Sequence, residues 1–285
     1  MFVHAAFHLQ FPFGGEPVKQ GLVLKMGGSL GGDSLQAVAS TIRMALAQER
    51  SVVLVHGGGP RISRALATQG IELPFVEGQR LTTDEAVHVV QRVLAEINLE
   101  VVTLLQSVGI PALGVATDNG LLEASPIPGL KRTARVNYVN ADPIREWTEA
   151  GQVPVFAPIG MKKGLIYNMN ADLAAAAIGG ALGANRVVFL TDVAGIYENW
   201  ETKKLLTNPS PQHLLQLYHA GSFQAGMIPK VEAVLACLDA GVPNAFVVDG
   251  RSEKAVAWAS LATEDELGAQ ETPLGTRVTR EGVFA

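Results

Sequence analysis

LVLKMGG, residues 22–28, is an apolar run that holds one lysine and ends in a glycine pair. Its apolar residues predict a buried β-strand, and the glycines predict a tight turn. Residues 33–49 carry apolar side chains at helical spacing, so the stretch opens a strand–turn–helix unit. Residues 51–59 repeat its beginning, because SVVLVH is followed by three glycines. Strands that are apolar on both faces and alternate with helices are typical of a parallel sheet covered by helices.

The same alternation continues along the chain. Further helices are predicted at residues 84–107, 143–151, 171–184 and 226–241. Each is followed by an apolar run typical of a buried strand, at residues 110–116, 153–160, 186–192 and 244–250. The sequence therefore predicts an α/β fold, a three-layer αβα sandwich with a mainly parallel central sheet. Glycine and lysine interrupt the pattern near 160–168, which divides the chain into a leader (1–20), an N-lobe (21–165) and a C-lobe (166–285).

The composition excludes several classes of protein. The chain has 285 residues, of which 48% are apolar and 17% charged, so a globular fold with a large core is expected. A net charge of −5 gives no electrostatic footprint for nucleic acid. Cys237 is the single cysteine, so no disulfide can form within the chain. No apolar run reaches the roughly 18–20 residues that cross a bilayer. We expect a cytoplasmic protein with no nucleic-acid or membrane partner.

The two glycine clusters are candidates for anion binding. Carboxyl ends of parallel strands share one sheet edge, where ligands of open α/β sheets bind. Glycines let backbone N–H groups approach an anion closely, and the following helix adds a favourable dipole. Lys25 precedes the first cluster, and it either reaches a phosphate or forms a salt bridge with a carboxylate. Neither cluster matches a known phosphate-loop fingerprint, so a plain turn is the alternative for each.

Two later segments add polar residues at strand–helix junctions. Asn168, Asn170 and Asp172 lead into an alanine-rich helix. Asn170 or Asp172 suits an N-cap, yet three polar groups exceed what one cap needs. Lys230 is predicted in the first turn of its helix, where the helix dipole disfavours a cation. A phosphate facing this lysine would explain its position.

Seven blocks then occur in one order along residues 20–280: LVLKMGG, VHGGGP, FVEGQRLT, YNMNAD, FLTDVAGIY, AGMIPKVEA and LGTRV. In this order they resemble the amino acid kinase family, and within it the N-acetyl-L-glutamate kinases most. The resemblance implies transfer of the γ-phosphoryl group of ATP to the γ-carboxylate of N-acetyl-L-glutamate, a step of arginine biosynthesis. It implies Mg²⁺ carried mainly on phosphate oxygens, with no dedicated protein metal site. It also implies that the N-lobe binds the amino acid and mediates dimerisation, and that the C-lobe binds ATP.

The resemblance also implies a role for individual residues. Lys25 and Lys230 would stabilise the charge on the moving phosphoryl group, and Asp172 would hold the two lysines in place. Arg80 would pair with the α-carboxylate of the substrate, and Asn168 would also bind the amino acid. Backbone N–H groups would come from Gly27 and Gly28 for the phosphates of ATP and from Gly57 and Gly58 for the substrate side. The nucleotide pocket would be shaped by Thr191, Asp192, Gly226 and Met227.

The chain departs from the acetylglutamate kinase pattern at residues 131–135, which are basic. Arg135 stands where an aspartate is frequent, and this resembles a sister group of kinases that act on glutamate or 2-aminoadipate attached to an acidic amino-group carrier protein. A solvated basic hairpin is the alternative interpretation. A non-catalytic sensor of the same fold is a further alternative, although retention of all three expected catalytic residues argues against it. A kinase for another anion, such as a nucleoside monophosphate or carbamate, is disfavoured by Arg80.

The leader does not resemble the long N-terminal helix that links dimers into hexamers in arginine-sensitive acetylglutamate kinases. It contains Pro12 and Pro17, which interrupt a helix. We therefore expect a homodimer with little or no inhibition by arginine.

His56 ends the second strand beside its glycines. A carboxylate nucleophile is already ionised near neutral pH and needs no general base. We therefore interpret His56 as a structural residue.

Overall fold

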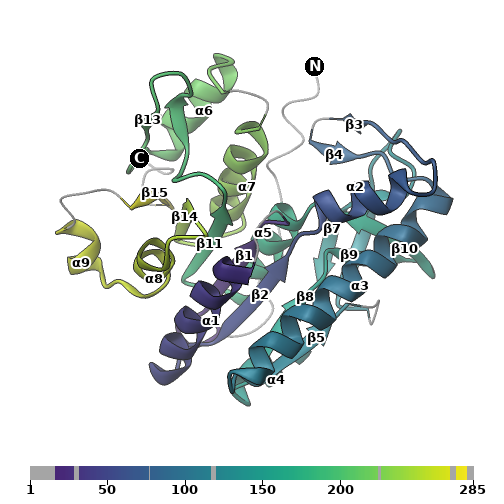
Figure 1. Cartoon of the computed structure of the whole chain (residues 1–285). Helices are drawn as coiled ribbons and strands as arrows, with labels where there is room; N and C mark the ends of the chain where they lie inside the picture. The colour runs from purple at the N-terminus through teal and green to yellow at the C-terminus, as the bar shows by residue number, and fades with distance from the viewer. Residues whose placement is uncertain are drawn as a thin grey trace.

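The computed structural model describes residues 17–28, 32–76, 78–116, 120–223, 226–269 and 274–280. Seven strands form the central sheet: β1 (Leu22–Met26), β2 (Val52–His56), β5 (Ala112–Val115), β8 (Val153–Phe156), β11 (Arg186–Thr191), β14 (Asn244–Asp249) and β15 (Gly275–Thr279). Their order is β15-β14-β11-β1-β2-β8-β5 (Figure 1). All neighbours pair in parallel except β14 and β15, which are antiparallel. The predicted mainly parallel sheet is confirmed.

Helices cover both faces of this sheet. One face packs against α1 (Gly32–Ala47), α3 (Asp84–Ser107) and α8 (Glu253–Leu261), which share one buried apolar cluster. The other face packs against α4 (Ala141–Glu149), α5 (Ala171–Leu182) and α7 (Ile228–Asp239) in a second cluster. Shorter helices are α2 (Gly59–Ala67), α6 (Pro211–His219) and α9 (Glu264–Gly268). The predicted three-layer αβα sandwich is therefore confirmed.

The pleat of β1 and β2 decides where their polar side chains point. In β1, Val23 belongs to the cluster beneath α5, and Met26 belongs to the cluster beneath α3. Because side chains alternate between the two faces of a strand, Lys25 lies on the α5 face. Met26 is in register with His56 in the neighbouring strand, so His56 lies on the α3 face. The two polar residues at this sheet edge thus enter different layers.

A smaller closed sheet lies beside the main one and holds β6 (Leu122–Pro126), β7 (Thr133–Val139), β9 (Ile159–Lys162) and β10 (Leu165–Met169). Two two-stranded sheets are formed by β3 (Phe75–Val76) with β4 (Gln79–Arg80) and by β12 (Tyr197–Asn199) with β13 (Lys204–Leu205). The single strand predicted at 153–160 is wrong, because β8 ends at Phe156 and β9 begins at Ile159. The main sheet takes strands from both sides of residues 160–168, and the division into lobes stays a prediction.

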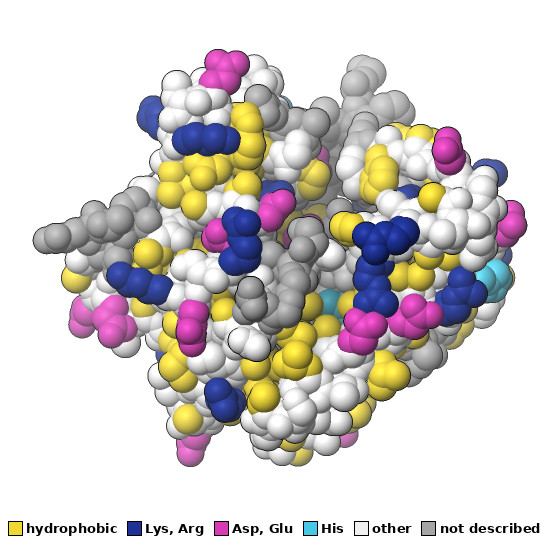
Figure 2. All heavy atoms as spheres, in the orientation of Figure 1, with side chains coloured by type: hydrophobic (Ala, Val, Ile, Leu, Met, Phe, Trp, Pro, Cys, Tyr) yellow, Lys and Arg dark blue, Asp and Glu magenta, His cyan; other side chains and the backbone are white. Residues whose placement is uncertain are grey.

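Within the described ranges, no helix combines the length and apolar character needed to span a membrane. Basic and acidic side chains are interspersed on the face drawn in Figure 2. The predictions made for residues 1–16 lie outside the described part of the chain.

Candidate active site

A pocket of about 380 Å³ opens where β1, β2 and β11 end. The N-terminal ends of α2, α5 and α7 also contribute to its wall. All the residues expected at the site line this pocket except Met227, and they are Lys25, Gly27, Gly28, Gly57, Gly58, Arg80, Asn168, Asp172, Thr191, Asp192, Gly226 and Lys230. The structure therefore brings together residues that lie up to 205 positions apart in the sequence, from Lys25 to Lys230.

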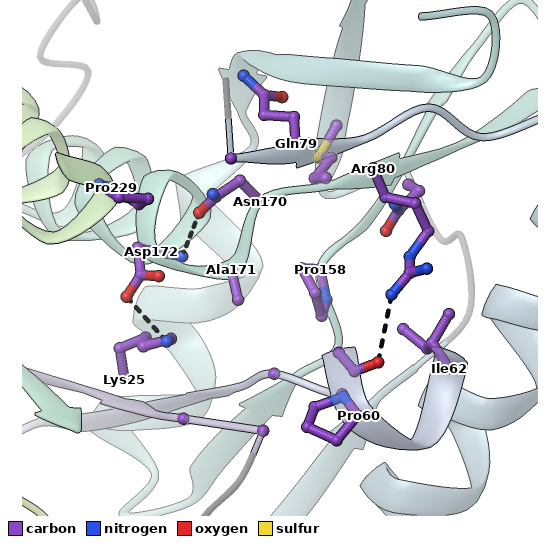
Figure 3. Close-up of a pocket in the computed structure, with 18 of the residues that line it drawn as sticks. Lys25, Pro60, Ile62, Gln79, Arg80, Pro158, Asn170, Ala171, Asp172 and Pro229 are labelled. Atoms are coloured by element: carbon purple, nitrogen blue, oxygen red, sulfur yellow. Dashed lines mark hydrogen bonds and ion pairs between the residues drawn. The ribbon is translucent and has the colours of Figure 1, made fainter. Parts of the chain in front are cut away.

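Lys25 and Asp172 form an ion pair inside the pocket, with 2.8 Å between Nζ and Oδ1 (Figure 3). The side chains are only 10% and 19% exposed. The pair forms because the pleat of β1 turns Lys25 toward α5, whose first turn carries Asp172. The salt bridge does not exclude a phosphate role, since a second lysine, Lys230, lines the same pocket.

Asn170 caps helix α5, which leaves the Asp172 carboxylate available for Lys25. The Asn170 Oδ1 accepts hydrogen bonds from the N–H groups of Asp172 at 2.8 Å and Leu173 at 3.1 Å. One side chain therefore satisfies two of the N–H groups that a helix start leaves unpaired. Of the two residues that the sequence suggested as the cap, Asn170 is the one used.

Lys230 lies in the first turn of α7, as expected, and its Nζ donates a hydrogen bond to the carbonyl of Gly226 at 3.1 Å. Among the described residues the structure records no ion pair between Lys230 and Asp172. The expectation that Asp172 holds both lysines is therefore met in the structure for Lys25 only. Lys230 carries its charge on a side chain that remains partly exposed to the pocket.

The four glycines differ in what their N–H groups do. Gly27 and Gly57 donate to carbonyls of β11 and β1, at 3.1 and 2.9 Å, and so extend the sheet. The expectation that they offer free N–H groups is therefore wrong, since the residue after a strand can continue its ladder. Gly28 and Gly58 keep N–H groups without a partner within the described chain. A Cβ on Gly28 would lie 2.7 Å from the nitrogen of Gly58, so the two turns approach too closely for side chains.

Arg80 lies on the opposite side of the pocket from Lys25 (Figure 3). Its guanidinium donates to the Ser63 hydroxyl at 2.7 Å and to the Gly59 carbonyl at 3.3 Å, and it stacks on Phe75. The residue is 7% exposed, and burial lowers the pKa of the guanidinium, although arginine stays charged in proteins. No carboxylate pairs with it in the described part of the chain. A buried cation of this kind favours an anionic ligand.

Asn168 lies beside Arg80 in a network of buried hydroxyl groups. Its Nδ2 donates to the Thr82 hydroxyl at 3.1 Å, and the described residues offer no partner to its Oδ1. The Thr82 and Thr133 hydroxyls both donate to the Arg80 carbonyl. Sequence reasoning missed both threonines, although Thr82 lies inside the FVEGQRLT block that drew attention to Arg80.

Met227 lines a second hollow of about 220 Å³ that adjoins the pocket. Asp192, Gly226 and Lys230 line both cavities and form the wall between them. Tyr197 and Trp200 also line the second hollow, with their rings edge to face at 5.5 Å between centroids. The sequence analysis above assigned neither aromatic residue to the site.

The basic segment at 131–135 is partly neutralised within the chain. Arg132 forms an ion pair with Asp84 in the first turn of α3. Arg135 lies half-buried on β7, in register with Ser125 of β6. Lys131 is exposed and has a left-handed backbone, with φ of 53°.

Comparisons with known proteins agree with this fold and site. The model of the amino acid kinase family matches residues 20–249. A protein named acetylglutamate kinase from Geobacillus thermodenitrificans is 36% identical over 255 residues, which cover 87% of this chain and 98% of that one. A protein of the same name from Geobacillus kaustophilus is 38% identical over 236 residues, which cover 81% of this chain and 90% of that one.

Among solved structures, N-acetylglutamate synthase from Neisseria gonorrhoeae, complexed with coenzyme A and N-acetyl-glutamate, superposes with a TM-score of 0.78. The match covers 91% of this chain and 59% of that one, at 22% identity. At this identity the likeness concerns the fold.

Proposed function

The chain belongs to the amino acid kinase family, and we propose that it transfers the γ-phosphoryl group of ATP to the γ-carboxylate of N-acetyl-L-glutamate. The products would be N-acetyl-L-glutamyl 5-phosphate and ADP, in arginine biosynthesis. The names of the relatives support the choice of substrate. One geometric observation carries the proposal. A single pocket holds Arg80 at one end, placed to bind a carboxylate, and Lys25 and Lys230 at the other, placed to neutralise phosphate charge.

The two ends suit the two ends of the proposed substrate. The buried Arg80 guanidinium would bind the α-carboxylate. The Oδ1 of Asn168, which has no partner among the described residues, would accept a hydrogen bond from the substrate amide. These contacts would aim the γ-carboxylate across the pocket toward the glycine turns. Fixing both reactants in line supplies much of what phosphoryl transfer needs from a protein.

In the proposed reaction a γ-carboxylate oxygen forms a bond to the γ-phosphorus, and the bond from that phosphorus to the β,γ-bridging oxygen breaks. Negative charge spreads over the transferred group and the departing ADP. Lys25 and Lys230 would neutralise this charge, and the N–H groups of Gly28 and Gly58 would donate to the phosphoryl oxygens. Asp172 would hold Lys25 in place without taking part in bond making.

Magnesium is part of the proposal as the companion of ATP, whose phosphate charge it would partly neutralise. The described residues contain no group of three or more His, Cys, Asp and Glu side chains that could hold a metal. An Mg²⁺ ion held mainly by phosphate oxygens and water would need no such group.

The location of the protein, its oligomeric state and the roles of its two lobes are also proposals. We propose a cytoplasmic homodimer, in which residues 21–165 bind the amino acid and residues 166–285 bind ATP. Gly226, Met227, Thr191 and Asp192 would border the nucleotide.

The alternative of a carrier-linked substrate rests on Arg135, since the ion pair with Asp84 already neutralises Arg132. An acidic carrier protein would dock near β6 and β7 in that case. The non-catalytic sensor is disfavoured by the arrangement of Lys25, Asp172 and Lys230 around one pocket.

The deciding experiment traps acyl phosphate with hydroxylamine after incubation with ATP and Mg²⁺. N-acetyl-L-glutamate, free glutamate and 2-aminoadipate are assayed side by side. We expect hydroxamate with the acetylated substrate only. No hydroxamate with any free amino acid would contradict the proposal and turn attention to a carrier-linked substrate or a sensor.

A matched pair of lysine variants tests the site assignment. Lys230→Ala should lose turnover with little change in folding stability, because the side chain is partly exposed. Lys254→Ala removes an exposed lysine from the first turn of α8, away from the pocket, and should retain turnover. Full activity of Lys230→Ala would remove Lys230 from the catalytic assignment.

A further inference from the structure

His56 and Asn98 form a buried polar pair behind the second glycine turn. Both are at most 2% exposed, and neither side chain lines the pocket. His56 Nε2 lies 3.1 Å from Asn98 Nδ2, and His56 Nδ1 lies 3.0 Å from the carbonyl oxygen of Gly57. Asn98 Nδ2 also donates to the carbonyl of Val155 at 2.8 Å. Both ring nitrogens of His56 and the amide nitrogen of Asn98 therefore lie within hydrogen-bond distance of a polar partner.

The bonding pattern fixes the position of the imidazole proton. The Asn98 atom that faces the Val155 carbonyl must be a donor, so it is the amide nitrogen and not the oxygen. The same nitrogen can only donate to His56 Nε2, which must then lack a proton. The neutral ring carries its proton on Nδ1 and donates it to the Gly57 carbonyl.

This hydrogen bond determines which way the peptide between Gly57 and Gly58 faces. In a trans peptide the C=O and the following N–H point in opposite directions. Because the Gly57 carbonyl points toward the ring on the α3 side, the Gly58 N–H points away from it. The Gly58 nitrogen lies beside Gly28, 2.7 Å from where a Cβ on that residue would be. The donor thus faces the turn that borders the pocket.

Two glycines in succession leave this peptide free to rotate unless something holds it, since neither residue has a Cβ. Rotation by half a turn would present a carbonyl oxygen where the N–H now lies. A partial negative charge would then face the site at which negative charge develops during transfer.

We propose that His56, with its tautomer set by Asn98, is a positioning residue that keeps the Gly58 N–H directed at the transferred phosphoryl group. The inference deepens the proposed function and rests on it for the identity of the anion. Room for the pair is left by a glycine in β5, the second strand along the sheet from β2. A Cβ on Gly114 of β5 would lie 2.6 Å from the Asn98 amide oxygen.

The first test reads the tautomer directly in the wild-type protein. Two-bond ¹H–¹⁵N correlations of the imidazole rings are recorded at pH 7, and the His56 signals are assigned by their loss in His56→Asn. We expect protonated Nδ1 and unprotonated Nε2. A proton on Nε2, alone or together with one on Nδ1, would overturn the inference. This readout does not depend on turnover, so it separates failure of the inference from failure of the proposed substrate.

The second test compares kcat at saturating ATP and N-acetyl-L-glutamate. His56→Leu removes the imidazole donor that holds the Gly57 carbonyl and should lower kcat by about tenfold or more. The upper bound is the loss of about 10²–10³-fold expected when one donor to a developing anion is removed completely. His56→Asn can place an amide N–H near the position of Nδ1 and should recover part of the loss. Leu105→Ala is the matched control, because it opens the same apolar cluster farther along α3 and should keep kcat.

Wild-type kcat in His56→Leu, or no recovery in His56→Asn, would overturn the inference. If His56→Leu does not fold, the tautomer measurement decides alone. A wild-type protein that forms no acyl phosphate would count against the proposed function and not against the orientation of the peptide.

Discussion

The two glycine turns occupy equivalent places in adjacent strands, yet they are supported by opposite kinds of side chain. Met26 and His56 are in register, so Gly27 and Gly57 follow at the same level of the sheet. The polar residue of the first turn, Lys25, comes one position earlier in its strand than His56 does in its own. A shift of one residue moves a side chain to the other face of a strand. Lys25 therefore enters the α5 layer, and His56 enters the α3 layer.

The two turns illustrate two ways in which a protein can present positive charge to an anion. At the first turn a full charge on Lys25 is held by a carboxylate in a pocket that solvent reaches. At the second turn a neutral imidazole, whose pKa burial lowers to about 4, would orient a backbone N–H. Removing the first support deletes a charge. Removing the second only frees a dipole to turn, so its effect should be smaller.

The largest effect is expected for Lys25→Met, which keeps an unbranched apolar side chain in the buried strand and removes the charge. We expect kcat to fall by about 10³-fold, as when a cation that stabilises a transferred phosphoryl group is lost. The measurement is hydroxamate formation at saturating substrates, with thermal unfolding to verify the fold. A loss below tenfold would contradict a catalytic charge on the first turn.

The next largest effect is expected for Gly28→Ala, which creates a steric clash between the two turns. Its Cβ would approach the nitrogens of Gly58 and Gly59 to 2.7 and 2.9 Å, so the backbone must shift. We expect about 10²-fold lower kcat, the scale of one lost donor. Gly268→Ala is the control, because its Cβ would meet open space outside the pocket. Equal activity of the two variants would argue against close approach of the turns.

A smaller effect on turnover is expected for Asp172→Asn, which weakens the support of Lys25. A hydrogen bond between charged groups contributes about 1.5 kcal/mol or more, so we expect about tenfold lower kcat. Asn170→Ala removes the helix cap instead and should lower the free energy of unfolding by about 1 kcal/mol. Denaturant unfolding and kinetics of both variants separate the two roles. A stability loss without a kinetic loss for Asp172→Asn would reverse the assignment.

Much of the fold follows from local pattern. Continuous apolar runs ended by glycine predicted the parallel strands, because a strand buried on both faces has few other compositions available. The division of residues 153–160 into β8 and β9 was missed, since an apolar run does not show where a chain turns from one sheet into another. The closed sheet that holds β6, β7, β9 and β10 was not predicted for the same reason.

Most of the residues expected at the site line one pocket, and their roles stay predictions. Their hydrogen bonds were predicted less well. Types of residue at strand ends indicated an anion pocket, and the pocket assembles them. Which N–H groups stay free depends on how far the hydrogen bonds of each strand pair extend. The sequence does not show this, so the N–H groups of Gly27 and Gly57 were wrongly expected to be free. The contact between His56 and Asn98 could not be predicted, because Asn98 lies 42 positions away. The residues around it in α3, from Leu94 to Val102, are all apolar or charged. Such contacts between distant elements are set by packing and not by local pattern.

The smallest effect concerns the stability of the second turn against acid. The pKa of His56 falls from 6.5 to about 4 on folding because burial disfavours the imidazolium. The unfolded chain therefore binds the proton first, and stability is lost as the pH falls from 6.5 toward 4. Between pH 8 and pH 6 this removes about 1 kcal/mol from the free energy of unfolding.

His56→Asn has no titrating group at this position, so its stability should change less with pH by about the same amount. Denaturant unfolding of both proteins at pH 8, 7 and 6 gives the difference. Parallel pH profiles for wild type and His56→Asn would mean that folding leaves the pKa of His56 unchanged. If the wild type instead gained stability relative to the variant as the pH falls, the imidazole would be protonated in the folded protein. The two turns would then both carry a cation, and the contrast between charge and orientation would be lost.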